Sequence, residues 1–172
     1  MESGSPDLPK LSTSIIIPDD GLMNFEIIEQ NYIEYSDIKI APSKGNLSRN
    51  INPEEIEYQF ANLYNNNTFY PSNIVELRTP YILRDLRGQT VVATPFQYNP
   101  VENILKVYTK IKVKVFNTGI GQENVLIQDK AYESIDNEFK NIYERQFINF
   151  NHDVRFDYLV DQGKMLIISY GD

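Results

Sequence analysis

The clearest pattern in the chain is an alternation of apolar and polar positions from Leu105 to Val115. Leucine, valine, threonine and isoleucine occupy the odd-numbered positions, and four lysines and a tyrosine occupy the even-numbered ones. Successive side chains of a strand point to opposite faces, so this period of two predicts a long strand with one buried face and one solvated face. We expect Leu105, Ile111 and Val113 in the core and the lysines on an edge or surface strand.

Turn-forming residues divide the remaining chain into short apolar segments. Further strands are predicted at residues 11–17, 25–35, 38–41, 75–86 and 89–94, and residues 97–103 join an antiparallel partner to the long strand. Between Asn137 and Phe150, apolar residues recur at spacings of three and four, which is typical of a helix with one packed face. The predicted fold is all-β, an antiparallel β-sandwich of jelly-roll-like form with one C-terminal α-helix.

The 172 residues suffice for one domain with its own core. We divide them into a domain at 1–150, a linker at 151–163 without periodicity, and a segment at 164–172 that resembles a buried strand cut off by the end of the chain. No apolar run approaches the roughly 20 residues of a membrane helix, so no membrane partner is expected.

Composition narrows the candidate chemistry. The net charge of −8 argues against nucleic-acid binding, which needs a cationic face. The absence of cysteine excludes disulfides and a cysteine nucleophile within this chain, and His152, the single histidine, has no nucleophile to activate. The acidic residues have no calcium-loop spacing, so we expect no catalytic residues, no metal, no cofactor and no small-molecule ligand.

Five motifs occur in an order that resembles one known family. They are G-S-P-D-L-P at 4–9, I-A-P-S-K-G at 40–45, F-Y-P at 69–71, I-L-R-D-L-R-G-Q at 82–89 and P-F-Q-Y-N-P at 95–100. Together they resemble the propeptide of gingipain-type cysteine peptidases, which are secreted bacterial enzymes, and the resemblance covers nearly the whole chain.

The resemblance implies an inhibitory and folding-assisting propeptide of a cysteine endopeptidase zymogen, without activity of its own. Its partner would be the cognate catalytic domain, whose first strand would begin within 164–172. The precursor would be secreted or exposed at the cell surface, with its signal peptide upstream of Met1. Whether the downstream enzyme prefers arginine or lysine stays open.

The resemblance also assigns a role to Arg49. This residue lies in a polar loop beside Ser48, with no acidic neighbour before Glu54. In the family, an arginine at this place is presented to the specificity pocket of the enzyme, which holds a carboxylate in the arginine-specific members. A planar guanidinium suits bidentate capture by a carboxylate. Lys44, on the same loop, is the second candidate, and substrate mimicry is the implied mechanism.

Three further arginines, Arg84, Arg87 and Arg155, are candidates for a functional role. Arg155 is the only basic residue of the linker 151–163, so the Arg155–Phe156 bond is the predicted processing site, in agreement with the arginine and following aromatic residue of the family. Arg84 and Arg87 flank Asp85; we favour ion pairs among these three residues or with neighbouring strands over contact with the partner enzyme.

Two alternatives come from another functional class. A β-sandwich with 12 tyrosines could be a carbohydrate-binding module, although the absence of tryptophan counts against sugar stacking. An adhesin-type surface module is the other alternative, and it leaves the apolar run at 165–168 without an explanation.

Overall fold

The computed structural model describes residues 2–127 and 137–150. The predicted linker with Arg155 and Phe156, and the predicted strand at 165–168, lie outside the described residues. The strands within the described part are β1 Leu11–Ile16, β2 Gly21–Tyr35, β3 Val75–Leu77, β4 Tyr81–Leu83, β5 Leu86–Ala93, β6 Phe96–Asn99 and β7 Ile104–Ile120. Helix α1 is Asn137–Gln146, and short 3-10 helices lie at Pro53–Glu55 (η1) and Asn62–Asn65 (η2).

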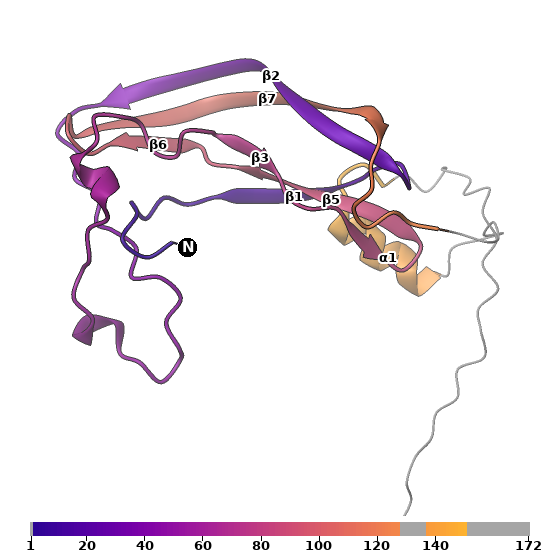
Figure 1. Cartoon of the computed structure of the whole chain (residues 1–172), viewed down its shortest axis with the longest axis horizontal. Coiled ribbons are helices and arrows are strands. Elements are labelled where there is room, and N and C mark those ends of the chain that lie inside the picture. Colours follow the sequence, from indigo (N-terminus) through magenta and orange to yellow (C-terminus); the bar gives the residue numbers. More distant parts are fainter. Residues whose placement is uncertain (1, 128–136, 151–172) are drawn as a thin grey trace, which may run out of the picture.

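The strands form two antiparallel sheets. One sheet has the order β1-β5-β3, with β4 also pairing with β5, and the other has the order β2-β7-β6. In Figure 1 the two sheets lie one above the other, and α1 lies at one end of the β1–β5 sheet. The predicted antiparallel sandwich with one C-terminal helix is confirmed. The predicted strand 75–86 is divided into β3 and β4, and residues 38–41 form no strand.

A β-bulge interrupts the alternation of the long strand. Asn31 pairs with Lys110 and Tyr32 pairs with Tyr108, so Thr109 is an extra residue on β7. An extra residue moves every following side chain to the opposite face of the sheet. The prediction of one buried face from Leu105 to Val115 is therefore wrong on one side of the bulge.

The side chains before the bulge show this reversal directly. Tyr108, predicted to be solvated, is half-buried: its hydroxyl donates to Oε1 of buried Gln97 at 2.6 Å, and it lines the same hollow as Val75 of the other sheet. Only 17% of the Lys106 side chain is exposed, and its ammonium lies 3.9 Å from the centre of the Phe69 ring. Lys106 and Tyr108, which the alternation assigned to the solvated face, are thus partly buried.

The lysines of β7 were expected on an edge or surface strand, and they do not lie on an edge strand. β7 is the central strand of its sheet, and its lysines meet glutamates on β2, with Lys110–Glu29 at 2.8 Å and Lys114–Glu26 at 3.4 Å. These exposed pairs each contribute about 0–1 kcal/mol, because water screens them. The pairs place opposite charges across β2 and β7 and contribute little to the stability of the sheet.

The most buried apolar residues lie elsewhere than predicted. Leu105, Ile111 and Val113 are half-buried, a correction to their expected core position: the neighbouring strand β2 also exposes Ile27, which pairs with Val113, and Ile33, so this sheet is only partly covered. Among the described residues, the buried hydrophobic side chains of the core are Leu8, Ile17, Ile74, Val75, Leu86, Val92, Tyr98, Tyr143 and Phe147.

Helix α1 docks on the β1–β5 sheet through an aromatic cluster. Tyr143 and Phe147 pack with Leu86 on β5, and the Tyr143 hydroxyl donates to Oδ2 of buried Asp85 at 2.9 Å. Burial and the Asp85 carboxylate raise the pKa of Tyr143, so its hydroxyl stays a proton donor. The predicted helix is confirmed.

The sequence predicted that Arg84 and Arg87 form ion pairs with Asp85 or with neighbouring strands. This prediction is right for Arg84 and wrong for Arg87. Arg84 pairs with Asp85, with Nε 3.3 Å from Oδ1, at the turn between β4 and β5. Arg87 is instead 1% exposed and donates to four backbone carbonyls, at 2.7–2.9 Å. The acceptors are the carbonyls of Pro18, Gly21, Glu123 and Asn124. Arg87 thus joins β5 to the β1–β2 turn and to the segment after β7.

Candidate functional site

The three residues predicted to bind the enzyme pocket all lie in one connection between β2 and β3. We define the Arg49 loop as residues 43–61, which include Lys44, Ser48 and Arg49. In Figure 1 the purple chain of this region extends away from both sheets, on the side of the molecule where the N-terminus lies. The loop therefore presents side chains beyond the body of the sandwich.

The N-terminal segment holds both ends of the Arg49 loop. The Gly4 amide donates to the Ser43 carbonyl at 2.9 Å, and the Gly4 carbonyl accepts from the Ala61 amide at 3.0 Å. The Ser43 amide donates to the Ser5 carbonyl at 2.7 Å. One residue, Gly4, thus binds the first and the last part of the loop.

Glycine is required at this junction. Gly4 has φ +85°, a conformation that side chains rarely adopt, and a Cβ there would lie 3.2 Å from the Ala61 amide nitrogen. Gly45 has φ +77° and faces the Ser3 side chain, which a Cβ would approach to 3.2 Å. Both glycines stand in motifs that carried the family resemblance, at 4–9 and 40–45.

A tyrosine side chain makes a further hydrogen bond next to the start of the loop. The Tyr64 hydroxyl on η2 donates to the Ile40 carbonyl at 3.0 Å, just before the loop begins. Burial raises the pKa of Tyr64 to about 12, with smaller contributions from Tyr98 and Asp7. The hydroxyl therefore stays protonated and able to donate across the neutral pH range.

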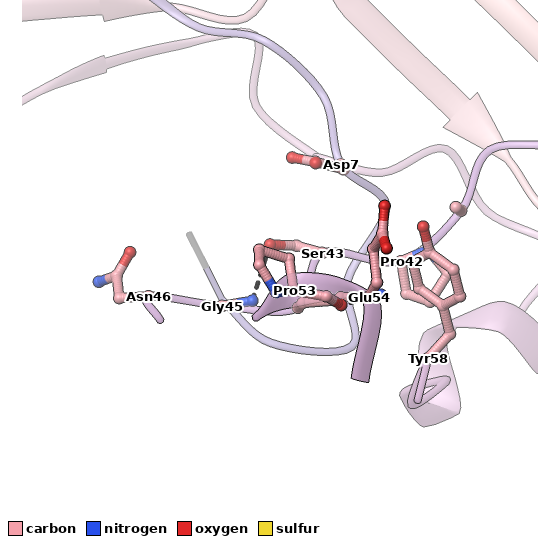
Figure 2. A pocket seen from close by; sticks show the side chains of 10 residues that line it. Asp7, Pro42, Ser43, Gly45, Asn46, Pro53, Glu54 and Tyr58 are labelled. Carbon is pink, nitrogen blue, oxygen red and sulfur yellow. Dashed lines mark hydrogen bonds between the residues drawn. The ribbon is translucent and has the colours of Figure 1, made fainter. Parts of the chain in front are cut away.

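Lys44 is engaged within the loop. Its Nζ donates to the Pro53 carbonyl at 2.6 Å and lies 4.3 Å from the centre of the Tyr58 ring. Figure 2 shows the hollow in this region, with Asp7, Ser43, Pro53, Glu54 and Tyr58 labelled around it. Lys44 also lines this hollow. The Lys44 ammonium thus binds a carbonyl and an aromatic face of its own loop.

Arg49 lies in an exposed turn of the loop. The Ile51 amide donates to the Ser48 carbonyl at 3.0 Å, so Ser48 to Ile51 form a turn with Arg49 as its second residue. The Arg49 side chain is exposed, and it makes no ion pair or hydrogen bond with another residue in the described part of the chain. This arrangement leaves a cation available to an acidic pocket of a partner.

The Arg49 loop also exposes apolar side chains. Ile51, Tyr58 and Phe60 are all exposed and all belong to the Arg49 loop. A loop that exposes an arginine together with aromatic and aliphatic side chains has a composition typical of protein–protein contact sites. Arg49, Lys44 and Ser48 are thus gathered in one loop, as the sequence predicted, whereas the N-terminal anchor was not predicted.

Other kinds of site find no support in the described ranges. Within residues 2–127 and 137–150, no group of three or more His, Asp or Glu side chains is placed to hold a metal ion. No helix in these same ranges is both long and apolar enough to cross a membrane.

Comparison with known proteins identifies relatives of the chain. The family model described as Propeptide_C25 matches residues 1–155. Gingipain R2 of Porphyromonas gingivalis is 40% identical over 151 residues, which cover 87% of this chain and 20% of gingipain R2. Lys-gingipain of the same organism is 26% identical over 163 residues, which cover 91% of this chain and 9% of that protein.

A solved structure shares the fold. A chain from the complex of the pro- and mature domains of Porphyromonas gingivalis RgpB matches with a TM-score of 0.78 at 40% identity. The match covers 87% of this chain and 74% of that chain. The match therefore spans most of that one solved chain, but only about a fifth of the gingipain R2 sequence.

Proposed function

The chain belongs to the Propeptide_C25 family, and we propose that it is the inhibitory and folding-assisting propeptide of a gingipain-like cysteine endopeptidase. Two observations support this over a carbohydrate-binding or adhesin module: the family match covers residues 1–155, and the related RgpB structure is a complex of pro- and mature domains. The precursor would be secreted or held at the cell surface, as the family resemblance implies.

Inhibition would proceed by substrate mimicry. The observation that carries this proposal is the placement of Arg49, exposed at the second position of a turn and without a partner in the described part of the chain. Its guanidinium would enter the primary specificity pocket of the peptidase and meet a carboxylate there in bidentate geometry. Ser48 would contact the enzyme beside the pocket.

Lys44 is the weaker candidate for the pocket. To enter it, the ammonium would have to leave the Pro53 carbonyl and the Tyr58 ring, both of which it contacts. Arg49 has no such intramolecular interaction to lose among the described residues. The loop therefore favours Arg49 as the pocket residue.

Release would follow cleavage of the linker. We place the processing site at the Arg155–Phe156 bond, outside the described residues. The match to the propeptide family ends at residue 155, which supports a boundary at this bond. N-terminal sequencing of the processed enzyme should then begin at Phe156; a start within the described domain would refute this boundary.

The proposed function is tested by adding the chain to its mature peptidase. We expect competitive inhibition of peptide hydrolysis and protection of the active-site cysteine from an alkylating reagent. A chain that binds the peptidase and leaves both unaffected would argue against blockage of the cleft. A chain that instead binds polysaccharide and not the peptidase would favour the carbohydrate-binding alternative.

A further inference from the structure

The contact between Lys44 and Pro53 closes a small ring of chain. The two residues are nine positions apart, and the Nζ–O distance of 2.6 Å joins them across the base of the segment that carries Arg49. The Tyr58 ring lies against the same ammonium group, 4.3 Å from centroid to Nζ. A charged hydrogen bond of this kind is stronger than one between neutral groups.

The Lys44–Pro53 contact affects how easily a protease can cleave the Arg49–Asn50 peptide bond. A protease cleaves a bond only when the chain can leave its local structure and extend through the active site. The Ser48–Ile51 turn holds Arg49 and Asn50 at its two central positions, in a bent conformation. As long as residues 44 and 53 stay joined, the segment between them has little freedom to straighten.

We infer that Lys44 is a positioning residue: it closes the base of the Arg49 loop and so keeps the Arg49–Asn50 bond from being cut. This role rests on the proposed function only in so far as Arg49 meets the peptidase. An arginine in an exposed loop is an ordinary substrate for an arginine-selective protease. The Lys44 closure is what would make this arginine a poor substrate and a lasting inhibitor.

A second set of hydrogen bonds, independent of the Lys44–Pro53 contact, closes the Arg49 loop further out. Gly4 joins Ser43 to Ala61 through backbone hydrogen bonds at 2.9 and 3.0 Å, outside the 44–53 segment. Loss of the Lys44 side chain leaves these bonds and both sheets in place. The Lys44→Met variant should therefore fold normally and loosen only the inner segment.

Limited proteolysis by trypsin tests this role without the cognate peptidase. We compare the whole chain with Lys44→Met, and with Lys112→Met as control, because Lys112 is an exposed lysine without an ion pair in the described part of the chain. Mass spectrometry follows cleavage at Arg49–Asn50 and separates it from cleavage at Lys44–Gly45.

We expect trypsin to cleave Lys44→Met at Arg49–Asn50 about tenfold faster than the wild-type chain. Without the charged hydrogen bond, the 44–53 segment should open locally about tenfold more often. The Lys112→Met rate should be unchanged, and Lys44→Arg, which keeps a cationic donor, should restore much of the resistance. Equal rates for the wild-type chain and Lys44→Met would overturn the inference.

Hydrogen exchange gives a second readout that does not need cleavage. The Ile51 amide, bonded to the Ser48 carbonyl, should exchange faster in Lys44→Met, while amides of β5 keep their protection. Faster exchange throughout the chain would mean general destabilisation and would refute a local role. If Arg49 does not enter the peptidase pocket, inhibition will be insensitive to Arg49→Ala, yet the trypsin and exchange results will still hold; the two failures are thus distinguishable.

Discussion

Phe147 occupies the space that a side chain on Gly88 would need. A Cβ on Gly88 would lie 2.5 Å from Cε1 of Phe147 and 2.9 Å from Cζ of Tyr81. The missing side chain of a β5 residue therefore lets α1 pack directly on the sheet, where Phe147 is 2% exposed. The helix that precedes the linker depends on this glycine for its position.

The Gly88→Ala substitution should destabilise the protein by about 1–3 kcal/mol, because the added methyl group pushes Phe147 and the helix away. The pair can be measured by urea unfolding in a double-mutant cycle. In a Phe147→Ala background the same change should cost much less, since the ring that it meets has gone. An equal cost in both backgrounds would show that the contact does not explain the glycine.

Arg87 should be the most sensitive arginine for stability. Arg87→Met removes the guanidinium donor from four carbonyls, of which the Pro18 carbonyl keeps the Gly21 amide, and it removes the link between β5, the β1–β2 turn and the segment after β7. We expect a loss of at least about 3 kcal/mol. Arg84→Met, which removes one partly exposed ion pair, should cost clearly less. Similar midpoints for the two variants in chemical unfolding would contradict this ranking.

The two faces of β7 near its middle should differ modestly. Ile111 is half-buried, so Ile111→Ala should cost about 1–2 kcal/mol, below the range for a fully buried isoleucine. Lys112→Ala, on the exposed face, should change stability by no more than about 0.5 kcal/mol. Thermal unfolding of both variants checks this; a larger effect from Lys112 would place the bulge elsewhere.

Tyr64 should give the protein a specific sensitivity to alkali. Its pKa is raised from 10.0 to about 12 in the folded state, so the folded protein keeps the neutral form while an unfolded chain ionises. The stability that Tyr64 contributes is thus complete below about pH 10 and is lost as the pH rises towards 12. The difference in unfolding free energy between the wild-type chain and Tyr64→Phe should shrink across this window. A difference that stays constant would mean that Tyr64 titrates normally.

The sequence predicted the elements better than the faces. Periodicity located the long strand and the helix, because both depend on local patterns of apolar residues. It could not locate the bulge at Thr109, since an extra residue in one strand is visible only against its partner, and Asn31 and Tyr32 are far away in sequence. The burial of Tyr108 and Lys106 follows from that bulge.

Arg87 and Gly4 show a second limit. The sequence around Arg87 suggests ion pairs with near neighbours, whereas its acceptors are backbone carbonyls at positions 18, 21, 123 and 124. Carbonyls carry no sequence signal. Gly4 stood in a motif of the family resemblance, but its role in holding the Arg49 loop emerges only when Ser43 and Ala61 are brought beside it.

The central claim is that Arg49 enters the specificity pocket of the peptidase, and inhibition constants for matched variants test it most directly. Arg49→Ala should weaken inhibition by roughly thirtyfold or more, the loss of about 2 kcal/mol typical of an arginine that anchors an interface. Arg49→Lys should be intermediate against an arginine-selective enzyme, because the planar fork is lost. The control Arg78→Ala, which removes an exposed pair with Glu76 at 2.8 Å, should leave the constant unchanged. An unchanged inhibition constant for Arg49→Ala would contradict the account.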